Sequence, residues 1–241
     1  MLKKYIKEII RRIGYSFNSS RDNQNIISKY RDEYTEEAFQ YFKKYFNKCV
    51  VFDKEEDIRK FAINEAIRCN DKNSNDCFLE FGVFKGNTIN FFAKILKEYN
   101  RIIYGFDSFL GLEENWTGTH LLKHIAFNTQ GKVPMIEKNV VIIKGKIEET
   151  LDDFIKDNLK DSKINFMHLD FDTFTPTNYV FKKLKKFTKK NTVILFDELY
   201  GFPSWKEHEF KALINNFIKE DYDYIAFSVK QAAIIINKDI N

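Results

Sequence analysis

The feature that most constrains the fold is an alternation of short apolar runs with amphipathic segments, which begins near residue 76. The apolar runs predict strands at 77–83, 102–106, 140–143, 163–169 and 192–197. The amphipathic segments predict helices at 86–99, 148–160, 175–189 and 205–220. Such alternation is typical of βαβ units, whose right-handed crossovers put helices on both faces of a parallel sheet.

The end of the sequence departs from this rule. Two strand-like runs, 222–229 and 232–237, are separated only by Lys230 and Gln231. Because so few residues leave no room for a crossover helix, the two runs must form an antiparallel hairpin. The sequence therefore predicts a doubly wound, Rossmann-like α/β sheet of seven strands that ends in an antiparallel hairpin. A dinucleotide-dependent dehydrogenase does not usually end in this way.

The first third of the chain shows helical periodicity alone. Helices are predicted at 35–47 and 53–69, and Asp53 with Glu56 forms a capping signal for the second. We therefore expect an N-terminal helical cap over residues 1–75 and a second domain over 76–241. Residues 1–14 form a basic, amphipathic helix candidate. It would pack on the protein, on a second subunit, or on an anionic membrane surface.

Composition excludes several classes of function. The 39 basic and 35 acidic residues give a net charge of only +4 and are mixed along most helices, so we expect no nucleic-acid partner. No run approaches the ~20 apolar residues of a membrane span, and the start lacks the apolar core and cleavage site of a signal peptide. The three cysteines lack metal or redox spacing, which favours a reducing, cytoplasmic location.

Two motifs indicate a binding site at the ends of the first two strands of this domain. The first is Phe78–Thr88 (FLEFGVFKGNT), in which glycines let a ligand approach the backbone before a helix begins. Its acid, Glu80, would repel a phosphate but attract a ligand that carries an amine. The second motif is YGFDSF, in which Asp107 ends the next strand, where an acid can accept hydrogen bonds from ribose hydroxyls.

A third cluster is acidic. Asp170 follows one strand, and Asp197 and Glu198 follow the next. Neighbouring parallel strands lie about 4.8 Å apart, so these carboxylates are expected to converge at the carboxyl edge of the sheet. Crowded carboxylates repel one another unless a cation neutralises them, and a hard divalent cation such as Mg²⁺ prefers oxygen ligands. The long segment 111–134, which contains Trp116, is expected to form a lid over this edge.

Together these clusters resemble the class I S-adenosylmethionine (SAM)-dependent methyltransferases, and within them the macrocin O-methyltransferase group, which methylates sugar hydroxyls with Mg²⁺. The resemblance covers residues 76–237 and is carried by LEFGVFKGNT, YGFDSFLGL, MHLDFDTFTPT and ILFDELYG. This group usually has two aspartates where the chain has Asp197-Glu198. The first 75 residues carry no specific match.

The resemblance implies a set of site residues. Glu80, Gly82 and Gly86 would shape the methionine side of the SAM pocket, Asp107 would hold the ribose, and the Gly145–Glu148 segment would face the adenine. The implied cofactor-binding residues are Glu80, Gly82, Val83, Gly86, Thr88, Asp107, Ser108, Phe109, Lys146, Ile147 and Asp170. The implied metal ligands are Asp170, Asp197 and Glu198, and Asp170 would also be the catalytic residue that takes the proton from the acceptor hydroxyl.

The expected reaction is SAM-dependent and Mg²⁺-dependent methylation of a sugar hydroxyl, on a surface glycan or a nucleotide-linked sugar. Three alternatives remain. One is a methyltransferase of catechol-like small phenols, in which Trp116 and Trp205 would bind the acceptor. Another is a non-catalytic SAM-binding partner in a glycan-assembly complex. The third, an NAD-dependent oxidoreductase, is disfavoured by Glu80 and by the terminal hairpin. A homo-oligomer is compatible with the sequence, and the acceptor cannot be named from it.

Overall fold

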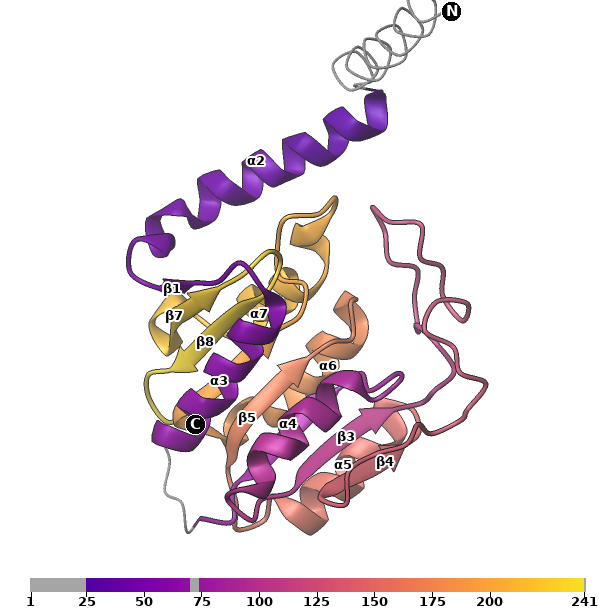
Figure 1. Cartoon of the computed structure of the whole chain (residues 1–241), viewed down its shortest axis with the longest axis vertical. Helices are drawn as coiled ribbons and strands as arrows, with labels where there is room; N and C mark the ends of the chain where they lie inside the picture. Colours follow the sequence, from indigo (N-terminus) through magenta and orange to yellow (C-terminus); the bar gives the residue numbers. More distant parts are fainter. Residues whose placement is uncertain (1–24, 70–73, 241) are drawn as a thin grey trace, which may run out of the picture.

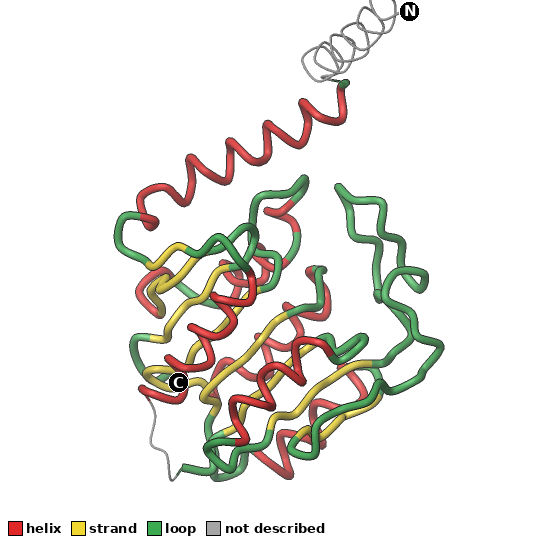
Figure 2. Tube along the Cα trace, in the orientation of Figure 1, coloured by secondary structure: helices red, strands yellow, loops and turns green. Residues whose placement is uncertain are grey.

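The computed structural model describes residues 25–69 and 74–240 and contains one mixed sheet of eight strands (Figures 1 and 2). The spatial order of the strands is β1-β7-β8-β6-β5-β2-β3-β4. All neighbouring pairs are parallel except the two made by β8, which runs antiparallel to both β6 and β7. The strands are β1 (Val50–Val51), β2 (Cys77–Phe81), β3 (Ile103–Asp107), β4 (Val140–Lys144), β5 (Ile164–Leu169), β6 (Thr188–Phe196), β7 (Tyr222–Phe227) and β8 (Ala232–Ile236).

The predicted doubly wound sheet with its terminal hairpin is confirmed, but the number of strands and the purely helical N-terminal region are corrected. The eighth strand, β1, pairs with β7 at the edge of the sheet. It has two residues, which is too short to produce a period-2 pattern in the sequence. Strand β6 begins at Thr188, four residues before the predicted start, because the preceding helix ends at Leu184.

Helices cover both faces of the sheet (Figure 1). Helices α3 (Glu55–Cys69) and α4 (Asn87–Lys97) lie on one face. Helices α5 (Ile147–Asn158), α6 (Phe174–Leu184) and α7 (Glu209–Asn216) lie on the other. Helix α2 (Ile26–Phe46) contacts β7 and buries Phe42 among aromatic side chains there. Parts of the chain from before residue 76 thus share the sheet and its cores.

The predicted helix at 205–220 is interrupted. The 3-10 turns η2 (Trp205–Glu207) and η3 (Lys219–Asp221) flank α7, and a third, η1 (Lys185–Phe187), follows α6. The helical path breaks at His208, whose backbone is neither helical nor extended (φ −115°, ψ −125°). The amphipathic segment 1–14 lies outside the described residues. Within the described part, no helix is both long and apolar enough to cross a membrane.

The central strands explain where the two cores lie. All residues of β2 and β5 are buried, as expected for strands covered by helices on both faces. Alternate residues of β2 therefore belong to different cores: Phe78 packs with α3 and α4, whereas Leu79 and Phe81 pack on the opposite face. This alternation also determines the direction of Glu80, which shares the face of Phe78.

Gly82 follows β2, where the loops after β2 and β5 approach each other closely. Its φ is +95°, and a Cβ atom there would lie 1.9 Å from the carbonyl oxygen of Asp170. Gly82 is therefore required both for its backbone conformation and for the spacing between the β2 and β5 ends.

We expect Gly82→Ala to lower the free energy of unfolding by about 2–4 kcal/mol, because it combines a left-handed backbone with a clash against main-chain atoms. The matched control is Gly201→Ala, since Gly201 has a similar φ of +82° but its Cβ would meet nothing closer than 3.6 Å. This control should cost about 1 kcal/mol. Chemical denaturation measures the free energy of unfolding of both variants. Equal losses of stability would contradict the close packing of Gly82 against Asp170.

Candidate functional site

A cavity opens at the carboxyl edge of the sheet, where β2, β3, β4 and β5 end. It encloses about 750 Å³ including its open mouth, within the usual range for small-molecule sites. Its lining residues come from the glycine turn, the β3 and β5 ends, the loop after β4, the starts of α5 and α6, and the 111–134 segment: Gly82, Phe84, Phe106, Asp107, Ser108, Gly111, Leu112, Glu113, Phe127, Gly145, Lys146, Ile147, Asp170, Phe171, Asp172 and Pro176. The predicted lid segment thus forms part of the wall.

The lining of the cavity has an apolar part and an acidic part. Aromatic and aliphatic side chains, among them Phe106, Phe127 and Ile147, provide a surface for a flat ring. Among the lining residues there are four carboxyl groups and one lysine, and this Lys146 lies 3.5 Å from the Glu113 carboxylate. Such a wall repels phosphates and attracts a ligand with positive charge and hydroxyl groups. SAM, with its sulfonium, amine, ribose and adenine, fits this lining.

Asp107 fixes the glycine turn rather than standing free in the cavity. Its Oδ2 accepts hydrogen bonds from the backbone N–H groups of Val83 and Phe84 (2.8 and 2.7 Å), and its Oδ1 accepts one from Phe109 (2.6 Å). A carboxylate has about four acceptor positions. One position therefore remains for a ribose hydroxyl, and the backbone N–H groups of Val83 and Phe84 are already paired with Asp107.

The predicted cofactor residues divide into two groups. Gly82, Asp107, Ser108, Lys146, Ile147 and Asp170 line the cavity. Glu80, Val83, Gly86, Thr88 and Phe109 are not among the lining residues. Gly86 instead begins α4 with a left-handed backbone, and Phe109 is fully buried in the core.

Glu80 points away from the cavity, toward the face covered by α3 and α4. Its side chain is fully buried, and its Oε2 lies 3.3 Å from Nδ1 of His168 on β5. The other ring nitrogen of His168 lies 3.4 Å from Oδ1 of Asp197. Burial works against the charged imidazolium, but these two carboxylates outweigh it and raise the pKa of His168 to about 9.

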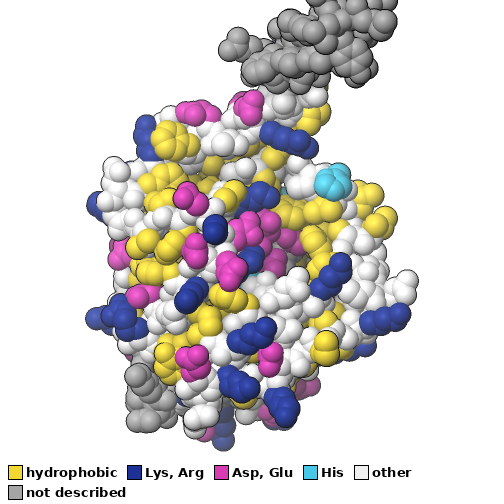
Figure 3. All heavy atoms as spheres, in the orientation of Figure 1, with side chains coloured by type: hydrophobic (Ala, Val, Ile, Leu, Met, Phe, Trp, Pro, Cys, Tyr) yellow, Lys and Arg dark blue, Asp and Glu magenta, His cyan; other side chains and the backbone are white. Residues whose placement is uncertain are grey.

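The acidic residues converge as expected, in two overlapping groups. Ligand atoms of Asp170, Asp172 and Glu198 lie within 4.8 Å of one another, and so do those of His168, Asp170 and Asp197. Asp170 belongs to both groups. Figure 3 shows acidic side chains gathered in a recess on this face of the molecule. Of the three predicted metal ligands, Asp170 therefore lies beside both Asp197 and Glu198, whereas Asp197 and Glu198 belong to different groups.

Sequence reasoning missed one acidic member of the cluster, Asp172, and one acid beside it, Glu209. Asp172 lines the cavity with a left-handed backbone (φ +62°), a conformation that tends to mark functional sites in residues other than glycine. Glu209 on α7 is fully buried, and its Oε2 accepts a hydrogen bond from the Glu198 N–H at 3.4 Å. Asp172 was visible in the LDFD motif, but nothing in the sequence separates Glu209 from the other charges of its predicted helix.

The pKa values of these carboxyl groups shift in opposite directions. Burial raises the pKa of Asp170, Asp172 and Glu209 well above the usual range, and burial with the nearby Asp197 charge raises the pKa of Glu198 to about 7. Burial also opposes ionisation of Asp197, but His168 and Arg59 lower its pKa to about 2. A concentration of buried carboxyl oxygens with so few cations is a donor set that suits a hard divalent ion such as Mg²⁺.

The comparison with known families agrees with this geometry. Residues 79–199, half of the chain, match the family model described as a methyltransferase domain. The chain belongs to this methyltransferase family. The match begins inside β2 and ends just after Glu198, so it spans the glycine turn, Asp107 and the acidic cluster. No curated protein gives a match to the sequence.

Solved methyltransferase structures share the fold. The chain is similar to CalS11, a calicheamicin methyltransferase, with a TM-score of 0.63 and 18% identity over 75% of this chain and 78% of that one. An apo structure of CalS11, described as a TDP-rhamnose 3'-O-methyltransferase, gives a TM-score of 0.55 at 18% identity with the same coverage. The O-methyltransferase NovP gives 0.55 at 16% identity over 76% and 79% of the two chains. The class I methyltransferase fold predicted from the sequence is therefore confirmed.

We expect Asp107→Asn to weaken SAM binding about tenfold or more, because the amide cannot accept from all three backbone N–H groups that shape the turn. Calorimetric titration of SAM measures the loss. The control is Asp152→Asn, which removes an exposed partner of Lys183 far along α5 and should leave SAM affinity unchanged. Wild-type affinity in Asp107→Asn would show that the turn does not depend on this carboxylate.

Proposed function

We propose that this methyltransferase transfers a methyl group from SAM to a hydroxyl of a sugar, in a reaction that depends on Mg²⁺. The observation that carries the proposal is that Asp170 and Asp172 belong both to the cavity wall and to the acidic cluster. A donor bound in the cavity and a cation bound by the carboxylates would therefore lie next to each other. CalS11, which shares the fold and is described as a TDP-rhamnose 3'-O-methyltransferase, supports this choice of acceptor.

Asp170, Asp197 and Glu198 would hold the cation, as the sequence suggested. When bound, SAM supplies an activated methyl group, and Mg²⁺ lowers the pKa of a nearby hydroxyl. The chain's own residues then have to align the acceptor, exclude water and receive a proton. Gly111–Glu113 and Phe127 from the lid segment border the cavity and would limit the access of water.

The residue that receives the proton should face the cavity and be free of the cation. Sequence reasoning assigned this role to Asp170, which belongs to both acidic groups. Asp172 also lines the cavity, and it belongs only to the group of Asp170 and Glu198, not to the group that contains Asp197. Because a carboxylate engaged with a cation is a weak base, we assign proton acceptance to Asp172 and cation binding to Asp170.

The alternative of a catechol-like acceptor loses the support that the tryptophans gave it. Trp116 and Trp205 are 5% and 0% exposed, and neither lines the cavity. Trp116 packs edge-on against Phe202, and Trp205 packs against Phe42 and Phe210. They therefore do not present a ring face to an acceptor.

We expect Asp172→Asn to lower kcat about 10²–10⁴-fold while SAM and Mn²⁺ still bind, because the variant removes the base and keeps the shape. Asp170→Asn should lower both kcat and Mn²⁺ affinity. Methyl transfer to a panel of nucleotide-linked sugars, with calorimetry of SAM and Mn²⁺ binding, measures these effects.

Two outcomes would contradict the proposal. Methyl transfer that persists at the wild-type rate after treatment with EDTA would exclude a role for the cation. SAM binding without transfer to any hydroxyl acceptor, and without change in Asp172→Asn, would favour a non-catalytic SAM-binding protein.

A further inference from the structure

Arg59 reaches the acidic cluster from α3, on the part of the chain that precedes the family match. Its Nη2 lies 2.8 Å from Oδ1 of Asp197, and the two side chains are only 21% and 14% exposed. Arg59 also lies 3.4 Å from Glu55 on its own helix, but that carboxylate is 47% exposed. The shorter and more buried contact is therefore with Asp197, and breaking a buried pair is costlier than breaking an exposed one.

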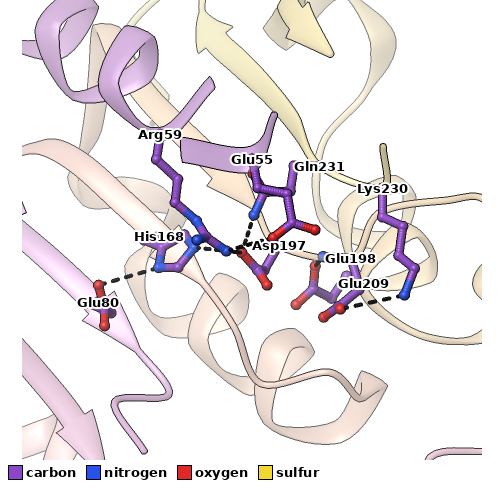
Figure 4. Close-up of polar contacts among 9 residues, drawn as sticks. All are labelled: Glu55, Arg59, Glu80, His168, Asp197, Glu198, Glu209, Lys230 and Gln231. Carbon is purple, nitrogen blue, oxygen red and sulfur yellow. Dashed lines mark hydrogen bonds and ion pairs between the residues drawn. The ribbon is translucent and has the colours of Figure 1, made fainter. Parts of the chain in front are cut away.

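Three donors from three separate elements converge on the same oxygen of Asp197 (Figure 4). Besides Arg59 of α3, Nε2 of Gln231 in the β7–β8 hairpin donates a hydrogen bond to Oδ1, and Nε2 of His168 on β5 lies 3.4 Å from it. The residues described here provide no donor for Oδ2 of Asp197. The carboxylate is thus anchored through one oxygen, and its other oxygen remains available.

Other charged residues surround the ion pair of Arg59 and Asp197. Glu80 lies behind His168, and Lys230 is 3.9 Å from Glu198 on the far side of the cluster. Ligand atoms of His168, Asp170 and Asp197 lie within 4.8 Å of one another, so the anchored Asp197 carboxylate is next to Asp170. A guanidinium presents its donors in a rigid planar fork, so it orients a carboxylate better than a lysine ammonium does.

We propose that Arg59 is a positioning residue for the cation site: with Gln231 and His168 it fixes one oxygen of Asp197 so that the other oxygen binds the cation. The proposal rests on the Mg²⁺ dependence argued above. It makes α3 part of the active site, because the family segment alone lacks both Arg59 and Gln231. Partners that orient a metal ligand typically change metal affinity by 10–100-fold when they are removed.

The test uses substitutions that do not change the net charge, because removing a positive charge would by itself strengthen cation binding. Arg59→Lys keeps the charge but loses the fork, and Gln231→Leu removes a neutral donor. The matched control is Arg68→Lys, on the same helix, whose arginine pairs with Glu65 at the surface. Mn²⁺ and SAM affinities are measured by calorimetry on the full chain, together with kcat and thermal stability.

We expect Arg59→Lys and Gln231→Leu each to weaken Mn²⁺ binding about tenfold, with SAM affinity within about twofold of wild type. Arg68→Lys should match wild type in both. A purely structural role would lower SAM affinity and thermal stability together with Mn²⁺ affinity, and that result would overturn the inference, as would unchanged or tighter Mn²⁺ binding in both variants. Wild-type protein that binds SAM but no Mn²⁺ would instead overturn the proposed Mg²⁺ dependence.

Discussion

The concentration of buried carboxyl groups at one edge of the sheet is the constraint on which the site depends. Parallel strands bring their carboxyl ends together, so residues that are 27 positions apart, such as Asp170 and Asp197, become neighbours. Their mutual repulsion in a region poor in water must be offset by positive charge. Arg59 and His168 provide that charge beside Asp197, whereas for Asp170, Asp172 and Glu198 the described residues provide only the longer ion pair from Lys230 to Glu198, at 3.9 Å.

Much of this arrangement was predictable because periodicity and order along the chain determine a doubly wound sheet. The strand ends, the glycine turn and the acidic edge all follow from that pattern. Glu80 shows where the reasoning fails. Its position in the motif was read correctly, but the face of β2 on which it lies depends on the strand's exact register. The two-residue alternation turns Glu80 toward His168, away from the cavity.

The remaining contributors were hidden because their importance arises only from long-range contacts. Arg59 lies 138 residues before Asp197, and Gln231 lies 34 residues after it. In the sequence, Arg59 is one of several charged residues on the predicted helix 53–69. Glu209 is likewise one of several on the predicted helix 205–220. No local pattern distinguishes a charged residue that will be buried against a site from one that will face solvent. Helix α3, from the part of the chain predicted as a helical cap, likewise packs against β6.

The antiparallel strand β8 has a consequence for how the chain folds. It lies between β6 and β7, so the sheet remains in two pieces until residues 232–236 take their place. Before that moment the edge of β6, which is apolar and fully buried from Val193 to Phe196, is open to pairing with other strands. Pairings between such distant segments form slowly, and exposed edges favour aggregation. During synthesis, a nascent chain that stalls before β8 would therefore expose the unpaired edge of β6 and depend on chaperones to avoid aggregation.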